Sequence, residues 1–480
     1  MRSQRCARLQ LLVMWLVTAA STAEQRKTYD GHRVYDVAVA NRSQASQIRQ
    51  LVDDGGFELW DDKGGSSGWL QVQVGPDDVP RLESALNTSE VPFRLRIADV
   101  QSIIDSQQSE NEAHRAGGRA KDLLRDGSGN SSSRAMRKLN AFPGFGTNAD
   151  NRRGRLDSGS DRDGAELETN SIYDEEDDDS DIDGFNLGAY HRFSDIEALL
   201  RRLPTRFPDH ITLHVIGRTH EGRPLYLVRL REDVSAPATK PVMWIDCGVH
   251  AREWISPAIC LYTIGRLLAG DQGWLTKYDW HLVPVMNPDG YEYSHTHDRL
   301  WRKNRRPVNY CTGVDLNRNF AARWGTFGVT FLECGLTFPG YRPFSELESR
   351  AVRDAVLRDR RRIAAFNSIH SYGQLWLLPY GYSWFASKDI GRQRRVGRAA
   401  TRAMRAVNGV PYRYGISSRV LYLDSGTSTD WAYRAGVRHS VAIEARDKGF
   451  YGFLLPPRLI LPTAREVWAG LAQQARMLAR

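Results

Sequence analysis

The stretch Asp246-Cys-Gly-Val-His250-Ala-Arg-Glu253-Trp254 decides the fold and the chemistry of this chain. It follows the apolar run from Val242 to Ile245, which predicts a buried strand. Side chains that leave the end of a strand in a tight turn can converge on one point. Imidazole nitrogen and carboxylate oxygen both bind zinc, and a catalytic zinc takes three protein ligands and a water. His250 and Glu253 therefore predict a zinc site if the chain supplies a third ligand. Without one, they are a surface ion pair.

His370 is the candidate for the third ligand. It ends the apolar run from Ala364 to Ile369, which also predicts a buried strand. A lone histidine in such a place is more often a hydrogen-bonded core residue. His370 repeats the strand-end placement of His250, however, and this repetition favours a metal ligand.

The composition places the chain among soluble globular proteins. Its 480 residues exceed one average domain, so two ordered units are expected. Hydrophobic residues make up 41% of the chain and charged residues 26%, and the formal net charge is +9. The arginines are scattered and no nucleic-acid recognition motif accompanies them. The charge therefore indicates acidic partners or solubility, and no nucleic acid.

Residues 1–23 have the pattern of a secretory signal peptide. Three arginines are followed by an apolar run from Leu9 to Ala20, and small residues come next at Ser21 to Ala23. The run is too short for a membrane anchor, and no later apolar run approaches the length of a membrane span. A secreted, extracellular protein without a membrane anchor is expected.

Four cysteines follow the signal peptide, namely Cys247, Cys260, Cys311 and Cys334. An even number fits disulfide bonds in an oxidising compartment. Four cysteines allow three connectivities, which the sequence alone does not resolve, although short-range pairing is the simplest. A four-cysteine zinc site is disfavoured because no C-x-x-C pair occurs.

Residues 24–105 predict a small α+β domain. Its expected strands are 34–39, 69–74 and 92–97, and its expected helices are 43–51 and 77–86. No catalytic constellation appears in it.

Residues 106–186 differ in composition. Ser, Gly, Asn, Arg and Asp dominate, and apolar clusters are absent from the sequence. Such a segment buries too little apolar surface to offset its ordering entropy, so we expect a disordered linker. Its paired basic residues, such as Arg152-Arg153, are expected sites of proteolysis.

Residues 187–480 alternate predicted strands and helices. This alternation predicts an α/β sheet that is covered by helices on both faces. In open α/β sheets the site lies beyond the carboxyl ends of strands, which is where His250 and His370 lie. The expected strands are 211–215, 225–230, 242–246, 281–285, 364–369 and 437–443, and the expected helices are 254–269, 345–359, 391–407 and 463–478.

Further motifs lie in order along this region. They are Ile216-Gly-Arg-Thr-His-Glu-Gly-Arg223, Asn287-Pro-Asp-Gly-Tyr291, Arg299-Leu-Trp-Arg302, Asp315-Leu-Asn317-Arg318, Ile369-His370-Ser-Tyr, Leu421-Tyr422, Ser428-Thr-Asp-Trp431 and Glu444-Ala-Arg-Asp447. With His250-Ala-Arg-Glu253, they make residues 187–478 resemble the secreted zinc metallocarboxypeptidases of the pancreatic carboxypeptidase A/B type. Residues 29–105 resemble that family's activation propeptide. The resemblance implies a mixed, twisted central sheet with helices on both faces, and a zymogen that a protease activates by cutting the linker.

The resemblance also implies the chemistry of the site. One Zn²⁺ is expected on His250, Glu253 and His370. Glu444 matches the glutamate that takes a proton from the attacking water, and Arg302 matches the arginine that stabilises the oxyanion. The cysteines fall where family members have disulfides, which supports the pairs Cys247–Cys260 and Cys311–Cys334.

The resemblance implies that the substrate is the C-terminus of a peptide or protein. Five further residues match residues that bind this substrate in the family. Asn317 and Arg318 match the clamp for its free carboxylate, which a guanidinium can bind bidentately. Tyr422 matches a mobile tyrosine that closes over bound substrate. Arg252 and Arg299 match residues of the outer subsites.

The specificity pocket departs from the family pattern. B-type members have an aspartate immediately before the Asp-Trp pair and accept a C-terminal Lys or Arg, whereas A-type members have an apolar residue there. This chain has Thr429, which matches neither. Asp424 falls where the family usually has a small residue lining the same pocket, and it is either a receptor for a basic side chain or a solvated loop residue.

Three alternatives remain open at this stage. An endopeptidase is disfavoured by Asn317 and Arg318. A zinc-binding pseudoenzyme that acts as an extracellular binding module is disfavoured by the presence of Glu444 and Arg302. Polyanion binding through the arginines at 358–362 and 392–395 is compatible with catalysis.

Overall fold

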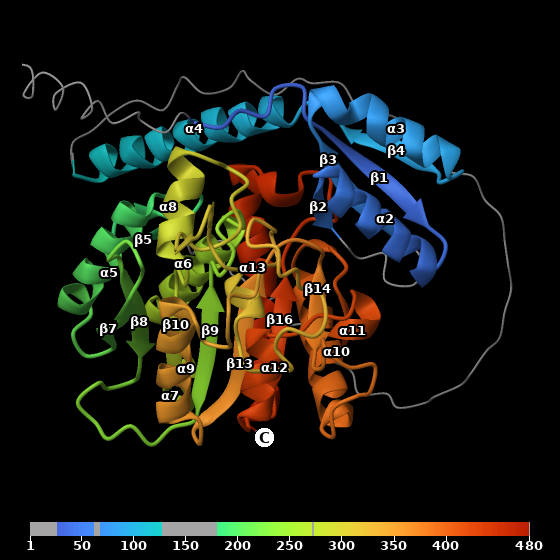
Figure 1. The fold of residues 1–480 in the computed structure, drawn as a ribbon. Coiled ribbons are helices and arrows are strands. Elements are labelled where there is room, and N and C mark those ends of the chain that lie inside the picture. Colours follow the sequence, from blue (N-terminus) through green and yellow to red (C-terminus); the bar gives the residue numbers. More distant parts are fainter. Residues whose placement is uncertain (1–25, 62–67, 127–179, 271–272, 480) are drawn as a thin grey trace, which may run out of the picture. The chain divides into compact units, whose positions relative to one another are not determined.

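The structure, a computed structural model, describes residues 26–61, 68–126, 180–270 and 273–479 (Figure 1). The predicted signal peptide and the Arg152-Arg153 pair lie outside the described residues. The chain divides into two units, residues 1–118 with 179–480, and residues 119–178. The domains and the site described below belong to the first unit.

An eight-stranded mixed sheet forms the centre of the C-terminal region, in the order β15-β14-β16-β13-β9-β10-β8-β7. The central strands β16, β13, β9 and β10 are parallel, and β8, β7 and β14 add antiparallel pairs. The predicted mixed α/β sheet is therefore confirmed. The strands are β7 (Ile211–Arg218), β8 (Pro224–Leu230), β9 (Val242–Cys247), β10 (Asp279–Val283), β13 (Ile363–His370), β14 (Leu375–Leu378), β15 (Arg413–Ile416) and β16 (Ser440–Glu444).

Alternation along the buried strands builds a core on each face of this sheet. In β9, Met243 and Ile245 pack into one core with helices α6, α10 and α13, while Val242 and Trp244 pack into the other with α9 and α12. Figure 1 shows helices on both faces. The helices are α5 (Phe193–Arg206), α6 (Ile255–Leu268), α7 (Trp274–Lys277), α8 (Pro288–Thr296), α9 (Leu347–Asp359), α10 (Ile390–Asn408), α11 (Ser417–Val420), α12 (Ser428–Arg434) and α13 (Ile460–Leu478).

The strands that neighbour β9 on its two sides, β10 and β13, come from different connections of the chain. The chain passes from β9 through α6 to β10 on one side, and later places β13 on the other side. Ligands of open α/β sheets bind at such a switch point, beyond the carboxyl ends of the strands. Here β9, β13 and β16 are neighbours, and all three end at the same edge. Short elements complete the region: β5 (Asp181–Ile182), β6 (Phe185–Asn186), β11 (Pro307–Val308), β12 (Cys311–Thr312), and 3₁₀ turns at Leu316–Arg318, Gly452–Leu454 and Pro457–Leu459.

The N-terminal region forms a four-stranded sheet in the order β2-β3-β1-β4. Its helices pack on the sheet around a core that includes Val37, Ile48, Val72 and Leu82. The strand β2 was not predicted, because four residues are too few to show alternation. The elements are β1 (Arg33–Val39), α2 (Arg42–Gly55), β2 (Glu58–Asp61), β3 (Gly68–Val74), a 3₁₀ turn at Pro76–Asp78, α3 (Val79–Thr88) and β4 (Phe93–Ile97).

The prediction of a disordered linker over 106–186 is wrong at both ends. Helix α4 spans Val100–Asp126, and the hairpin of β5 and β6 buries Ile182 and Phe185. The helix has few apolar residues, but its polar side chains bond the catalytic region. Gln107 donates to the Leu455 carbonyl at 2.8 Å, and Asn111 donates to the Tyr190 carbonyl at 2.9 Å. Tertiary hydrogen bonds thus order a segment whose composition alone indicates disorder.

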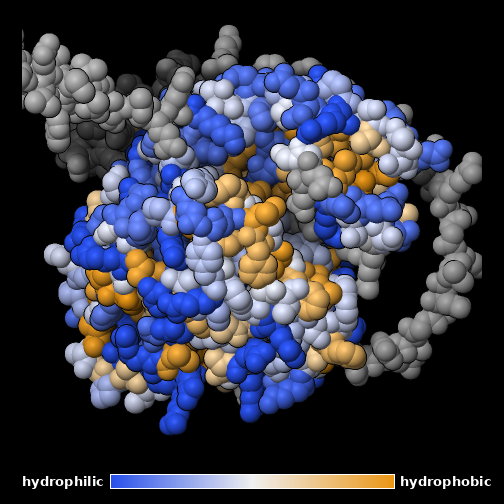
Figure 2. All heavy atoms as spheres, in the orientation of Figure 1, coloured by the Kyte–Doolittle hydropathy of each residue, from blue (hydrophilic) through white to orange (hydrophobic). Residues whose placement is uncertain are grey.

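Two further expectations concern cysteines and membranes. Cys247 is bonded to Cys260 and Cys311 to Cys334, which is the short-range pairing. Within the described ranges, no helix has both the length and the apolar content needed to cross a bilayer. The face drawn in Figure 2 is mostly hydrophilic, with hydrophobic residues in separate patches.

Candidate metal and catalytic site

The ends of β9 and β13 bring His250, Glu253 and His370 together. All three are buried, and one ligand atom from each lies within 4.8 Å of the other two. Nδ1 of His250 is 2.7 Å from Glu253 Oε1, and Nδ1 of His370 is 3.2 Å from Glu253 Oε2. Two imidazole nitrogens and a carboxylate that face one point fit the donor set of a catalytic zinc.

A glycine makes the turn after β9 possible. Gly248 has φ +65°, a left-handed conformation that strongly favours glycine. A Cβ at this position would lie 3.0 Å from Cγ of Pro257 in α6. The turn therefore places His250 and Glu253 beside the strand end, while α6 packs closely against it.

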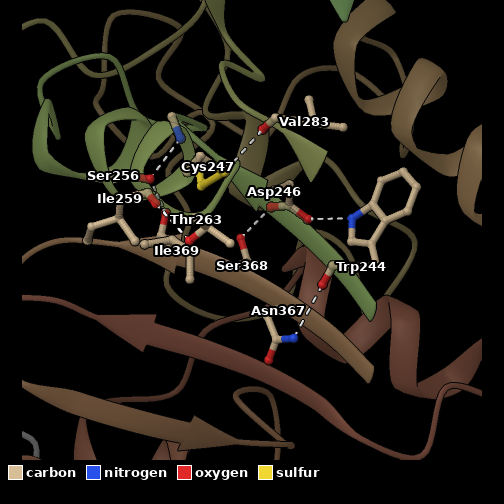
Figure 3. The surroundings of a disulfide bond; sticks show 12 residues. Trp244, Asp246, Cys247, Ser256, Ile259, Thr263, Val283, Asn367, Ser368 and Ile369 are labelled. Carbon is tan, nitrogen blue, oxygen red and sulfur yellow. Dashed lines mark hydrogen bonds between the residues drawn. A yellow bond between two sulfur atoms is a disulfide. The ribbon is translucent and has the colours of Figure 1, made fainter. Parts of the chain in front are cut away.

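Outer hydrogen bonds hold the two imidazole rings. Nε2 of His250 is 3.2 Å from Asp315 Oδ1, and Nε2 of His370 is 3.2 Å from Ser368 Oγ. The Ser368 hydroxyl in turn donates to Asp246 at 2.6 Å, and Trp244 donates to the same carboxylate at 3.0 Å (Figure 3). Such partners occupy one ring nitrogen and leave the other, here Nδ1, for a metal.

The charges of the buried acids follow from their neighbours. Burial raises the pKa of Glu253, but His250 and His370 outweigh this effect and hold it well below its usual range. Burial raises the pKa of Asp246 to about 6, although hydrogen bonds from Ser368 and Trp244 and the charge of His370 oppose the rise. Glu253 is therefore an anion that is ready to bind a cation.

Asp315, to which the sequence pattern gave no role, contacts two of the predicted site residues. Its Oδ2 accepts hydrogen bonds from Arg302 Nε at 3.1 Å and Nη2 at 2.9 Å, while Oδ1 faces His250. Burial raises the pKa of Asp315, but Arg302 and His250 hold it well below the ordinary value. One carboxylate thus contacts both His250, a candidate metal ligand, and Arg302, the arginine predicted to stabilise the oxyanion. Its place two residues before Asn317 was the only sequence pattern that pointed to it.

The predicted metal, catalytic and substrate-binding residues, except Arg252 and Arg299, line a cavity of about 100 Å³. Glu444 ends β16 directly opposite His370 in the strand register. Arg318 donates from Nε to the Gly328 carbonyl at 2.9 Å and from Nη2 to the Tyr422 hydroxyl at 3.3 Å. The cavity is lined by His250, Glu253, His370, Glu444, Arg302, Asn317, Arg318, Tyr422, Asp424 and Thr429, among others.

Arg252 and Arg299 do not line this cavity. Both are almost fully buried, and both contact the N-terminal region. Arg252 forms an ion pair with Glu58 of β2, and Arg299 donates to Gln107 of α4 at 3.0 Å. An outer-subsite role for these arginines stays a prediction.

The N-terminal domain also reaches the cavity. Trp60 of β2 lines it, together with Tyr372 and Phe453 of the catalytic region. Nearby, the Tyr372 hydroxyl donates to Gln71 Oε1 at 2.5 Å, and Gln71 donates to the Gly449 carbonyl at 3.1 Å. A side chain of the first domain is thus part of the wall of the site formed by the second.

Comparison with known proteins agrees with this architecture. Residues 196–470 match the zinc carboxypeptidase family, and residues 35–107 match the carboxypeptidase activation peptide. Carboxypeptidase A1 of Bos taurus is 30% identical over 472 residues, which cover 96% of each chain. Carboxypeptidase B2 of Homo sapiens is 41% identical over 296 residues, or 60% of this chain and 70% of that protein. The crystal structure of carboxypeptidase A from Helicoverpa armigera superposes with a TM-score of 0.76 at 28% identity, covering 94% of this chain and 98% of the other.

Proposed function

This chain belongs to the zinc carboxypeptidase family, and on that premise we propose that it is a secreted exopeptidase, made as a zymogen, that removes residues from the C-termini of peptides and proteins. One observation carries the proposal. The Asn317 and Arg318 side chains line the same cavity as the three metal-binding residues and Glu444. A clamp for a terminal carboxylate therefore lies beside a hydrolytic centre.

Each side chain has a distinct task in this reaction. His250, Glu253 and His370 would hold a zinc ion, which would supply a Lewis acid for the scissile carbonyl and for the attacking water. Glu444 accepts the proton of the attacking water and passes it to the leaving amine. Arg302, which Asp315 holds in place, donates to the oxyanion that develops on the carbonyl oxygen.

The clamp fixes where the chain is cut. The guanidinium of Arg318 and the amide of Asn317 bind the free carboxylate of the last residue, so that only the final peptide bond reaches the metal. The Tyr422 hydroxyl, which accepts from Arg318, closes the same side of the cavity. An endopeptidase does not need this clamp.

The N-terminal domain keeps the site latent. Trp60 occupies part of the cavity wall, and the Glu58–Arg252 ion pair and Gln71 bonds hold the domain in place. Helix α4 extends the contact as far as Arg115, which forms an ion pair with Asp195. An activating protease therefore cuts after this helix, within residues 127–179, and Arg152-Arg153 is a candidate position.

Secretion rests on two features of the chain. Residues 1–23 have the pattern of a signal peptide. Two disulfide bonds lie in the catalytic region, and such bonds persist in oxidising compartments.

The function is tested by activating the purified chain with trypsin. After the cut, it is expected to release single residues from peptides with a free C-terminal carboxylate and to leave the same peptides untouched when they are C-terminally amidated. The uncut chain is expected to be inactive on both. Mass spectrometry of the products measures this. Internal cleavage, or equal cleavage of amidated peptides, would refute an exopeptidase.

We further propose that Asp424 gives this site a preference for C-terminal Arg or Lys. Asp424 lines the cavity and is mostly buried, and its Oδ1 atom has no hydrogen-bond partner among the described residues. Burial raises its pKa, although Arg318 lies 3.6 Å from Oδ2 and opposes the rise. A cationic substrate side chain would compensate the buried charge, which otherwise remains costly.

Three neighbours bear on this role. Thr429, at the position that is acidic in B-type members, offers only a hydroxyl. Gly381 leaves room for the carboxylate, since a Cβ there would lie 1.9 Å from Asp424 Oδ1. Burial, followed by the charge of Asp424, raises the pKa of Asp430 to about 8. The carboxyl groups of Asp424 and Asp430 therefore both line the pocket, and a basic substrate side chain would stabilise their negative charge.

The substitution Asp424→Ala is expected to lower the ratio of kcat/KM for hippuryl-Arg to that for hippuryl-Phe by about 10- to 100-fold, or about 1.4 to 2.7 kcal/mol. Thr429→Ala is the matched control and is expected to change the ratio less than about threefold. If Asp424 only holds Arg318, Asp424→Ala will lower both rates equally and leave the ratio unchanged. That result would refute the specificity role.

A further inference from the structure

Helix α10 presents an unusual surface in the catalytic region. Six of its arginines are exposed, its sequence contains no acidic residue, and none of the six forms an ion pair with a described residue. Helix α5 shows the contrast, because Arg201 and Arg202 pair with Glu197 and Asp183. The six arginines are Arg392, Arg394, Arg395, Arg398, Arg402 and Arg405.

A hollow of about 490 Å³ opens near the first turn of α10. Arg392 of α10, Arg360 and Arg361 after α9, and Arg438 before β16 line it, and no acidic residue does. Its wall also includes the first residues of β13. It therefore lies at the amino ends of strands β13 and β16, whereas His370 and Glu444 lie at their carboxyl ends.

His439 has a buried ring nitrogen without a partner in this hollow, as expected at a ligand site. It lines the hollow and is only 4% exposed, and its Nε2 atom has no hydrogen-bond partner in the described part of the chain. A buried polar atom without a partner costs free energy. Burial, followed by the charge of Arg392, lowers the pKa of His439 to about 4, although Asp389 opposes the shift. An anion in the hollow would offset the repulsion between the arginines and stabilise a proton on His439.

A second basic hollow continues the surface along α10. It measures about 360 Å³ and is lined by Arg398 and Arg402 of α10 and by Arg413 of β15. Arg392 and Arg402 are ten residues apart on one helix, which separates them by about 15 Å along its axis. Two basic hollows at this spacing suit a linear chain with repeated anionic groups better than a single small ion.

We propose that the two hollows and the arginines of α10 form a binding site for sulfated polysaccharide. Sulfate groups would occupy both hollows, and guanidinium groups would bind them through charge-assisted hydrogen bonds. The choice of a sulfated polysaccharide over nucleic acid rests on the secretion proposed above. The first hollow lies at the opposite ends of β13 and β16 from the catalytic cavity, and no residue that lines the second hollow also lines that cavity, so the enzyme can cut peptides while it is bound.

Binding of the intact chain to immobilised heparin tests this proposal. We expect retention at about 0.15 M salt and release as the salt rises, because the Debye length falls from about 8 Å to about 3 Å at 1 M. Arg360→Gln with Arg438→Gln, and separately Arg398→Gln with Arg402→Gln, should each weaken affinity at least about fivefold. Arg323→Gln with Arg342→Gln is the matched control, since both are exposed and neither forms an ion pair with a described residue. It should weaken affinity less than about twofold.

Other outcomes would overturn the proposal. Equal losses in all three double variants would show that net charge alone retains the chain. No retention at low salt, equal binding of desulfated heparin, or tighter binding of duplex DNA of equal charge would each refute a sulfate-specific site. A heparin hexasaccharide should also shift the His439 imidazole resonances in NMR spectra, and no shift would exclude the first hollow. Peptidase activity is measured separately, so that a failure here is distinct from a failure of the proposed function.

Discussion

Replacing Glu444 with glutamine is expected to lower kcat by about 10²- to 10⁴-fold, the range that a positioned general base contributes. Glutamine has the same shape but cannot accept the proton of the attacking water. Glu444 ends β16 opposite His370, so the amide would stay beside the metal ligands. Steady-state kinetics on the activated enzyme measure the loss, and KM should change much less than kcat because the clamp is intact.

Two controls separate this effect from a structural one. The midpoint of thermal unfolding and the zinc content of Glu444→Gln should match those of the unaltered enzyme. If the variant kept more than about a tenth of the original kcat, Glu444 would not be the general base. A loss of zinc would instead show that Glu444 supports the metal site.

Removing the third ligand by His370→Ala is expected to take the zinc content from one ion per chain to nearly none and to abolish activity. The two remaining donors, His250 and Glu253, do not make a catalytic zinc set, which requires three protein ligands. Loss of the Lewis acid costs several kcal/mol of transition-state stabilisation, and about 4 kcal/mol corresponds to about 10³-fold in rate. Elemental analysis of the purified chain measures the metal directly.

Thermal unfolding provides a readout of this variant that does not depend on activity. Zinc at 100 times its Kd should stabilise the unaltered chain by about 2.7 kcal/mol and leave His370→Ala nearly unchanged. His220→Ala, which removes an exposed histidine, is the matched control and should bind zinc normally. Full zinc content in His370→Ala would show that another residue is the third ligand.

Local sequence patterns were sufficient to predict the central strands and the candidate metal ligands. The run from Val242 to Ile245 is apolar at every position, because a strand covered on both faces exposes neither side. His370 ends one such run and His250 follows the other after a turn at Gly248, so their convergence depends on that turn and on the strands being neighbours. The resemblance to a family supplied the roles of Arg302, Asn317 and Glu444, which lie on separate segments.

Contacts between distant segments were not visible in the sequence. Asp315 acts through His250 and Arg302, which lie 65 and 13 residues away. Trp60 reaches the cavity from a strand of four residues, which is too short to show periodicity. Composition alone indicated disorder over 106–126, but hydrogen bonds from Gln107 and Asn111 to the catalytic region order that helix.

The sequence by itself predicted the class of sheet and the zinc donors His250, Glu253 and His370, whereas it left three disulfide connectivities open, of which the structure shows the short-range one. The predicted features depend on residue type and on short spacings along the chain. Only the tertiary structure decided that Arg252 and Arg299 face the activation domain, that Asp424 is buried beside Arg318, and that His439 lies without a partner in a basic hollow. Burial and pairing depend on which segments pack together, and the free energy of a charged group depends on those neighbours more than on its place in the chain.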